Sequence, residues 1–353
     1  MKRMAEYQRL DEVCHINMGQ SPDSKSYNQE GVGLPFFQGN ADFGAVHPET
    51  RVWCSSPTKI VEAGTLLISV RAPIGALNFA KERSCIGRGL AGITPQNGVS
   101  LKYIYYCLKG KNKELNAKGT GSTFKAIAKS ALGETSVKIV SEEDQLKIIQ
   151  TLDRVSSVIE ARKQQLTELD NLIKARFVEL FYDKGYPVLK WNDVFNTTTG
   201  KLDSNAAVDS GEYPFFTCSK EVLKIDKYAF EQEALLLAGN NAAGKYDVKY
   251  YNGKFNAYQR TYVLGLKEDW SYRLFQYQLE DKLVYLQQQS LGGLTKYLTL
   301  KILGELEFII PPKDKQEEFE LFVKQTDKSK VVVQKALDEA QTLFDSLMQE
   351  YFR

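Results

Sequence analysis

An internal repeat constrains this chain more than any other feature, because each copy ends in one long, charged stretch with a heptad pattern. The two stretches cover residues 141–182 and 313–353, and each follows a block rich in short β-forming segments. A stiff helix at the end of each copy is suited to holding two similar heads at a fixed separation. The sequence therefore predicts a head over 1–140, a long helix over 141–182, a second head over 183–312 and a second long helix over 313–353.

Three landmarks carry the duplication. "LPFFQG" from Leu34 is echoed by "YPFFTC" from Tyr213, "GTLLISVRAPIGA" from Gly64 aligns with "EALLLAGNNAAGK" from Glu233, and "TGSTFKAI" from Thr120 aligns with "LGGLTKYL" from Leu291. Gly75 is thereby matched to Gly244 and Lys125 to Lys296. The offset of the lysine pair continues to the C-terminus without a gap and pairs Gln145 with Gln316. Short apolar segments between Gly, Pro and Asn turns, followed by long helices, predict an α+β fold class: two similar α/β domains with a pseudo-two-fold internal repeat.

Apolar residues recur every seven positions in both long stretches, which predicts a two-helix coiled coil. The seam is predicted at Leu152, Ile159, Leu166, Ile173 and Leu180 in the first helix, and at Val323, Leu337, Phe344 and Leu347 in the second. Each helix would extend about 60 Å, whereas the link Tyr182–Pro187 reaches only about 20 Å. The second head must then follow at the far end of the first helix, so we predict that the two helices are antiparallel.

Composition bounds the class of protein. The chain of 353 residues is 43% hydrophobic and 25% charged, as in soluble globular proteins, and its apolar runs are too short for a membrane span. The N-terminus has no apolar signal-peptide core, so we expect a cytoplasmic location. Five cysteines without a C-x-x-C pair and only two histidines argue against a disulfide or zinc framework, and no metal site is predicted.

Motifs of a DNA-modifying enzyme are not found. The D/N-P-P-Y/F turn of amino-methyltransferases has no match, because "IIPPK" lacks the polar first residue and the aromatic last one. "GTGSTF" is too short for a glycine-rich cofactor loop and lacks the spacing of a P-loop. The sequence therefore predicts no catalytic residues.

Basic residues are clustered, although the formal net charge is only +2. One run contains Lys109, Lys111, Lys113, Lys118, Lys125 and Lys129, and a second group, Lys245, Lys249, Lys254 and Arg260, is interleaved with tyrosine and phenylalanine. Cations along a phosphate track, with aromatic faces between them, suit binding to a nucleic-acid backbone. A solvated helix face and an ordinary strand pair explain the same residues, so charge alone leaves both interpretations open.

The head–helix–head–helix order, with "TGSTFKAI" before the first helix and "EEDQLKIIQTLD" at its start, resembles the specificity subunit of a type I restriction-modification system. The resemblance covers essentially the whole chain. It implies that each head is a target-recognition domain for one half of an asymmetric, bipartite site in double-stranded DNA, and that the helices fix the spacer between the halves. The second copy departs from the pattern, since "LGGLTKYL" lacks the Ser122-Thr123-Phe124 trio.

The same resemblance implies partners, and no catalytic activity or cofactor in this chain. Two modification subunits would methylate adenine with S-adenosylmethionine. Restriction subunits would use ATP and Mg²⁺. No membrane is expected among the partners.

Candidate DNA-binding residues lie in the aligned landmarks. Arginine can contact guanine bidentately and asparagine can contact adenine. These chemistries select Arg71, Arg88 (aligned with Arg260), and Asn240 and Asn241 (placed opposite Val70 and Arg71). Contact with phosphate suits Lys125, Lys296, Lys245, Lys249 and the hydroxyls of Ser122 and Thr123. Each has a structural alternative as well: an arginine paired with an acid, an asparagine turn, a solvated lysine or a backbone cap.

Two other functions stay open on the sequence. A self-sufficient DNA methyltransferase or nuclease would bind S-adenosylmethionine or cleave DNA without partners. A coiled-coil scaffold would not bind DNA, so its binding would not weaken steeply with salt.

Overall fold

The computed structural model describes residues 6–96, 98–121, 125–242 and 244–352. The chain divides into two compact units: unit 1 is Met1–Lys163 with Lys335–Arg353, and unit 2 is Gln164–Gln334. Each unit therefore holds one head and a part of both long helices. The division falls inside the helices, and the head boundaries at 140 and 183 stay a prediction.

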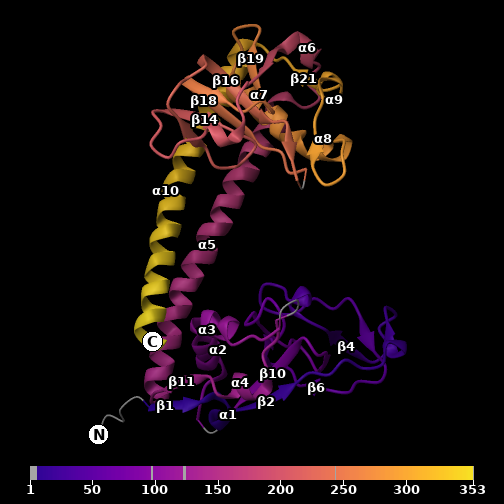
Figure 1. Ribbon diagram of the computed structural model, residues 1–353, viewed down its shortest axis with the longest axis vertical. Coiled ribbons are helices and arrows are strands. Elements are labelled where there is room, and N and C mark those ends of the chain that lie inside the picture. Colours follow the sequence, from indigo (N-terminus) through magenta and orange to yellow (C-terminus); the bar gives the residue numbers. More distant parts are fainter. Residues whose placement is uncertain (1–5, 97, 122–124, 243, 353) are drawn as a thin grey trace. The chain divides into compact units, whose positions relative to one another are not determined.

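Head 1 is built from short strands and a few helices (Figure 1). Its strands are β1 (Glu6–Arg9), β2 (Cys14–Met18), β3 (Tyr27–Asn28), β4 (Leu34–Phe37), β5 (Trp53–Cys54), β6 (Ile60–Val61), β7 (Leu66–Ser69), β8 (Leu77–Phe79), β9 (Ser84–Ile86), β10 (Leu90–Pro95) and β11 (Ser136–Ile139). Its helices are α1 (Leu10–Val13), α2 (Leu101–Gly110), α3 (Asn112–Ala117) and α4 (Lys129–Gly133). The strands form sheets in the orders β2-β10-β7-β8, β3-β5-β4-β9-β6 and β1-β11.

Head 2 repeats this plan. Its strands are β12 (Val188–Lys190), β13 (Phe195–Thr199), β14 (Tyr213–Phe216), β15 (Leu223–Ile225), β16 (Phe230–Ala238), β17 (Asn240–Asn241), β18 (Val248–Ala257), β19 (Thr261–Leu266), β20 (Lys296–Tyr297) and β21 (Glu307–Ile309). Its helices are α6 (Trp191–Val194), α7 (Tyr272–Asp281), α8 (Leu283–Gln289) and α9 (Leu300–Gly304). The main sheet has the order β13-β19-β16-β18-β14-β15.

Strand pairing shows that the two heads share one topology. β4 pairs in parallel with β9 through Phe36 and Cys85, and β14 pairs in parallel with β18 through Phe215 and Asn256. β18 is continuous where head 1 has two shorter strands, β8 and β9, so the two larger sheets of head 1 correspond to one sheet in head 2. The predicted internal repeat and the α+β class are confirmed.

The core of unit 1 joins the head to both long helices, α5 (Glu142–Phe181) and α10 (Lys313–Phe352). α2 turns Tyr103, Tyr106 and Leu108 inward, where they pack in one hydrophobic cluster with strand residues of the head. The same cluster contains the α5 residues Ile149, Leu152 and Ile159 and the α10 residues Phe344, Met348 and Phe352. α2 is therefore the layer through which head 1 holds the helix pair (Figure 1).

In unit 2 the helix pair is antiparallel. Asp170 of α5 pairs with Lys330 of α10, and one further turn and a half along α5 Arg176 pairs with Glu318, which comes earlier in α10. An apolar cluster with Ile173, Leu180, Phe181, Phe319 and Val323 fills the interface and also contacts Leu274 of α7. The predicted antiparallel direction is confirmed.

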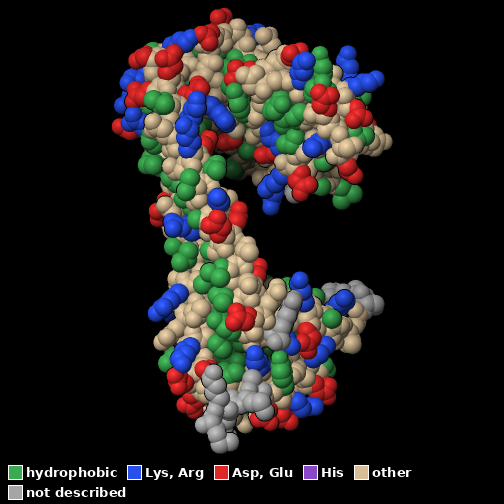
Figure 2. Space-filling view, turned by 90° about the vertical axis from the view of Figure 1, so that its left-hand side faces the viewer, with side chains coloured by type: hydrophobic (Ala, Val, Ile, Leu, Met, Phe, Trp, Pro, Cys, Tyr) green, Lys and Arg blue, Asp and Glu red, His purple; other side chains and the backbone are tan. Residues whose placement is uncertain are grey.

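The predicted seam residues lie on the inner sides of the helices. Leu152, Ile159, Ile173, Leu180, Val323 and Phe344 are buried, and Leu166, Leu337 and Leu347 are half-buried. The heptad pattern does not predict the buried aromatic residues toward the ends of the helices. Phe181, Phe319 and Phe352 are each at most 3% exposed. Figure 2 shows hydrophobic side chains on the surface of the long helices. The exposed apolar residues of α5 and α10 include Leu146, Leu172, Val178, Leu321, Val331, Val332 and Leu343.

A glutamine fastens each head to a long helix in the same way. In unit 1, Gln145 accepts a hydrogen bond from the Ser100 backbone N–H (2.9 Å) and donates one to the Val140 carbonyl (3.0 Å). In unit 2, Gln316 accepts from the Ser271 N–H (2.9 Å) and donates to the Pro311 carbonyl (2.8 Å). Both glutamines are 3% exposed. The predicted pairing of Gln145 with Gln316 is confirmed.

We expect the substitution Gln145→Ala to destabilise unit 1 by about 1–3 kcal/mol, because it leaves the Ser100 N–H and the Val140 carbonyl without this partner. Chemical denaturation monitored by circular dichroism measures the change. Gln150→Ala is the matched control, since Gln150 is exposed on the same helix. Equal midpoints for the two variants would contradict the fastening role.

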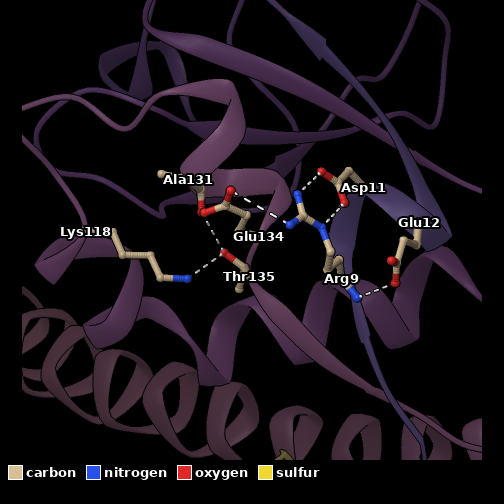
Figure 3. Close-up of polar contacts among 7 residues, drawn as sticks. All are labelled: Arg9, Asp11, Glu12, Lys118, Ala131, Glu134 and Thr135. Carbon is tan, nitrogen blue, oxygen red and sulfur yellow. Dashed lines mark hydrogen bonds and ion pairs between the residues drawn. The ribbon is translucent and has the colours of Figure 1, made fainter.

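Polar contacts fix the strand that precedes α1 against α4 (Figure 3). Arg9 donates two hydrogen bonds to Asp11 (2.9 and 2.8 Å) and lies 3.8 Å from Glu134. The hydrogen bond from the Arg9 guanidinium lowers the pKa of Asp11. Lys190 and Glu305 make the corresponding ion pair in head 2, at 3.9 Å.

Candidate nucleic-acid interface

Three loops of head 1 meet where β7 ends. The Val70 N–H donates to the Gly89 carbonyl (2.9 Å), so the segment after β7 is joined to the turn between β9 and β10. The Ala72 N–H donates to the Lys125 carbonyl (3.0 Å), and this joins it to the segment before α4. Residues 70–76, 87–89, 120–121 and 125–126 are called the head 1 loop cluster below.

Head 2 brings the equivalent loops together. The Gly239 N–H donates to the Arg260 carbonyl (2.8 Å), and the Leu298 N–H donates to the Gly239 carbonyl (2.8 Å). Beyond Gly239, β17 pairs with β20. Residues 239–242, 244–245, 258–260 and 291–297 are called the head 2 loop cluster.

Side-chain amides hold the head 1 loop cluster in one conformation. Asn112 and Asn116 of α3 donate to the Gly75 and Ile74 carbonyls at 3.0 and 2.6 Å, and the Ser69 hydroxyl donates to the Pro73 carbonyl at 2.7 Å. Gly75 has φ +88°, which favours glycine. Gly244 has φ +66° at the matching position of head 2. Loops fixed in this way can present side chains to a ligand with little loss of conformational entropy.

The structure places most of the predicted cations and both asparagines on these loops. Arg71, Arg88 and Lys125 are exposed in head 1, and Lys245 and Arg260 are exposed in head 2, while Asn240 and Lys296 are half-buried. Within the part of the chain that the structure describes, none of these side chains has a hydrogen-bond or ion-pair partner. Ser122 and Thr123 lie outside the described residues. Each cluster therefore carries cationic side chains whose charge no described acid neutralises.

Two predicted residues are used internally instead. Lys249 forms an ion pair with Asp247 and donates to the Ser219 carbonyl (2.9 Å). The Asn241 side chain accepts a hydrogen bond from the Lys245 N–H (3.2 Å). It therefore stabilises the turn, which is the structural alternative that the sequence left open. Neither geometry supports the predicted DNA contact.

Two of the sequence alignments were wrong, and strand register corrects them. Leu90 pairs with Ser69 in head 1, and Thr261 pairs with Ala238 in head 2, so Leu90 corresponds to Thr261. Arg88 therefore corresponds to Gln259, and Arg260 to Gly89. Arg71 forms a bridge to Ala126 and Asn240 pairs with Tyr297, so Asn240 corresponds to Arg71, not Val70. The sequence alone does not reveal that Gln259 matches Arg88, because a one-residue shift in turns of low similarity can be detected only from the hydrogen-bond register.

Three lysines of the head 1 run make contacts within the head or with α10. Lys111 and Lys118 both pair with Glu114, at 3.2 and 2.8 Å. Burial opposes ionisation of Glu114, but hydrogen bonds from these two lysines lower its pKa below the ordinary value. Lys109 lies over the Phe344 ring of α10, 4.9 Å from the centroid. Apart from Lys125, this run is better explained by the solvated-helix alternative.

The aromatic residues of the second basic group are structural. Tyr246 is 7% exposed, and the Tyr250 hydroxyl donates to Glu233 (2.7 Å). Burial and that hydrogen bond raise the pKa of Tyr250 to about 12. Arg273 lies over the Tyr250 ring at 4.3 Å. These rings are not arranged as a surface for stacking bases.

The described ranges contain no group of three or more histidine, cysteine, aspartate or glutamate residues that could hold a metal ion. Over the same ranges, no helix combines the length and apolar character that a bilayer span requires.

Comparison with known proteins identifies the family of this chain. The family model for the type I restriction modification DNA specificity domain matches residues 4–171 and 184–339, once for each repeat. A protein named as the MjaX specificity subunit of a type I restriction enzyme, from Methanocaldococcus jannaschii, is 38% identical over 160 residues, which are 45% of this chain and 38% of that protein. The type I restriction enzyme EcoDI specificity subunit of Escherichia coli is 35% identical over 134 residues, which are 37% of this chain and 29% of the relative. The matched segments thus span well under half the length of these relatives.

One solved structure is similar over its full length. The crystal structure of a type I restriction-modification system S subunit from M. genitalium has a TM-score of 0.64 and 17% sequence identity, covering 99% of this chain and 96% of that one. At this identity the likeness shows a shared fold.

Proposed function

This chain belongs to the family of type I restriction-modification DNA specificity proteins, and from that premise we propose that each head binds one half of a bipartite DNA site. The loop clusters are the observation that carries the proposal. Both heads gather uncompensated cations on hydrogen-bonded loops at the end of equivalent strands, β7 and β16, and head 2 adds the Asn240 amide. Cations supply the affinity for phosphate, and arginine and amide side chains supply base discrimination.

The long helices are proposed to fix the spacer between the two half-sites. Each is one uninterrupted helix of 40 residues, about 60 Å long. The antiparallel packing of the helices and the shared topology of the heads support the proposal that the two heads bind DNA in opposite orientations. Each head could then present a different strand for modification.

The chain is proposed to recruit its enzymes and to carry out no chemistry itself. Modification subunits would supply S-adenosylmethionine and adenine methylation, and restriction subunits would supply ATP-driven, Mg²⁺-dependent cleavage. The exposed apolar residues of α5 and α10 support a protein-binding role for these helices, because a partner that covered them would remove their apolar surface from water.

Salt dependence tests the DNA-binding role. We expect the logarithm of affinity for duplex DNA to fall linearly with the logarithm of salt concentration, and Lys125→Ala or Lys296→Ala to reduce the slope by about 1 each. Lys249→Met is the matched control: its ammonium group is already paired with Asp247, so the slope should not change. Fluorescence anisotropy over a salt series, with the full chain bound to modification subunits, gives the slopes.

Binding without salt dependence would contradict the proposal and favour a scaffold. An enzyme acting alone would be revealed by calorimetric binding of S-adenosylmethionine to the purified chain, for which we expect a flat trace.

A further inference from the structure

The two loop clusters carry the same cation at one position and different side chains at two others. Lys125 corresponds to Lys296, because the residues that follow them, Ala126 and Tyr297, pair with Thr120 and Leu291 in the same antiparallel way. Arg71 corresponds to Asn240, since Arg71 pairs with Ala126 and Asn240 with Tyr297. The equivalence of these residues in the two heads therefore follows from backbone pairing and does not depend on similarity of their side chains.

The third position lies in the turn beside the first two. Strand register equates Leu90 with Thr261, so the residue two places earlier is Arg88 in head 1 and Gln259 in head 2. Head 1 thus has arginine at both variable positions, and head 2 has an amide at both.

These side chains are available for a ligand. Arg71, Arg88 and Gln259 are exposed, and Asn240 is half-buried. Among the described residues, the arginines and Asn240 have no side-chain partner. Gln259 makes one long contact, 3.4 Å from its Nε2 to Asp203, which a base could replace at little cost because the pair is exposed.

Arginine and the two amides have opposite preferences in the major groove. The guanidinium group donates twice to N7 and O6 of guanine, whereas a carboxamide donates to N7 and accepts from the N6 amino group of adenine. A lysine that is the same in both heads suits a contact that carries no sequence information, such as phosphate.

We propose that Arg71 and Arg88 select guanine in the half-site bound by head 1, and that Asn240 and Gln259 select adenine at the equivalent base pairs bound by head 2. This inference rests on the proposed function, and it further assigns the base that each of these residues recognises. The two halves of the target then differ because equivalent backbone positions carry different hydrogen-bonding groups.

Selection from a duplex pool with randomised half-sites tests the proposal, using the full chain assembled with modification subunits. Three proteins are compared: the natural chain, the double variant Arg71→Asn with Arg88→Gln, and the reciprocal variant Asn240→Arg with Gln259→Arg. All four positions are on the surface or half-buried, and thermal unfolding checks that each variant is folded. Lys125→Ala serves as the phosphate-type control.

We expect the first variant to exchange guanine for adenine in one half-site and to leave the other half unchanged, with a preference of roughly 5- to 150-fold at each contacted position. The reciprocal variant should change the other half in the opposite direction. Lys125→Ala should weaken binding of all sequences alike.

An unchanged target in both double variants would overturn the inference, and so would equal weakening of every sequence, which would assign the arginines to phosphate. Failure of the natural chain to enrich any bipartite site would overturn the proposed function itself. The selection result for the natural chain therefore distinguishes failure of this inference from failure of the proposed function.

Discussion

Inserting one heptad into each long helix is expected to lengthen the spacer of the target site by up to about three base pairs without changing either half-site. Seven residues add about 10 Å to a helix, and one base pair adds about 3.4 Å. The insertion points are between Lys163 and Gln164 and between Gln334 and Lys335, where the chain passes from one unit to the other. Repeating residues 157–163 and 335–341 keeps the apolar spacing in register.

The same insertion should weaken binding, because three base pairs also rotate the DNA by about a third of a turn. Selection from duplexes with variable spacers measures both effects. Inserting the heptad into α5 alone is the control: it shifts the seam on one side only, so we expect loss of stability and no defined new spacer. An unchanged spacer in the paired insertion would refute the role of the helices in measuring distance.

Replacing Phe319 by alanine is expected to destabilise unit 2 by about 3–5 kcal/mol. The ring is fully buried and contacts Phe177, Phe181 and Tyr277, with centroid distances of 5.8, 5.5 and 5.6 Å. Its removal leaves a cavity at the place where α5, α10 and α7 meet. Urea unfolding, followed by circular dichroism, measures the free-energy change.

Leu321→Ala is the control on the same helix, because Leu321 is 58% exposed and should change stability by less than about 0.5 kcal/mol. Similar losses for both variants would mean that the aromatic cluster is not the principal contact between the helices in unit 2.

The coarse architecture was predictable because it depends on periodicity. Leu152, Ile159 and Ile173 recur at heptad spacing, and burial on one helix face requires that pattern whatever the surrounding sequence. The short link between the first helix and the second head determined the antiparallel direction by length alone. The match of Gly75 to Gly244 was also visible, since both have a positive φ.

The candidate site was only partly predictable because its geometry depends on register and on partners. A shift of one residue in the turn concealed the correspondence of Arg88 with Gln259, and backbone pairing was needed to find it. Lys249 was predicted to contact phosphate from composition, but its neighbour Asp247 neutralises it. Which cation lacks an acid nearby is a three-dimensional property that local sequence does not contain.

The glutamines that fasten the heads, Gln145 and Gln316, bond to main-chain groups at both ends of their amides. Because these hydrogen bonds use main-chain groups, they do not depend on which side chains the neighbouring residues carry. Substitutions elsewhere in a head therefore leave this attachment intact. Loop residues such as Arg71 and Asn240 could therefore diverge in the course of evolution while the mounting of each head stayed the same. If the loop clusters recognise DNA as proposed, such an attachment would let the target sequence change while each head stayed fastened to its helix in the same way.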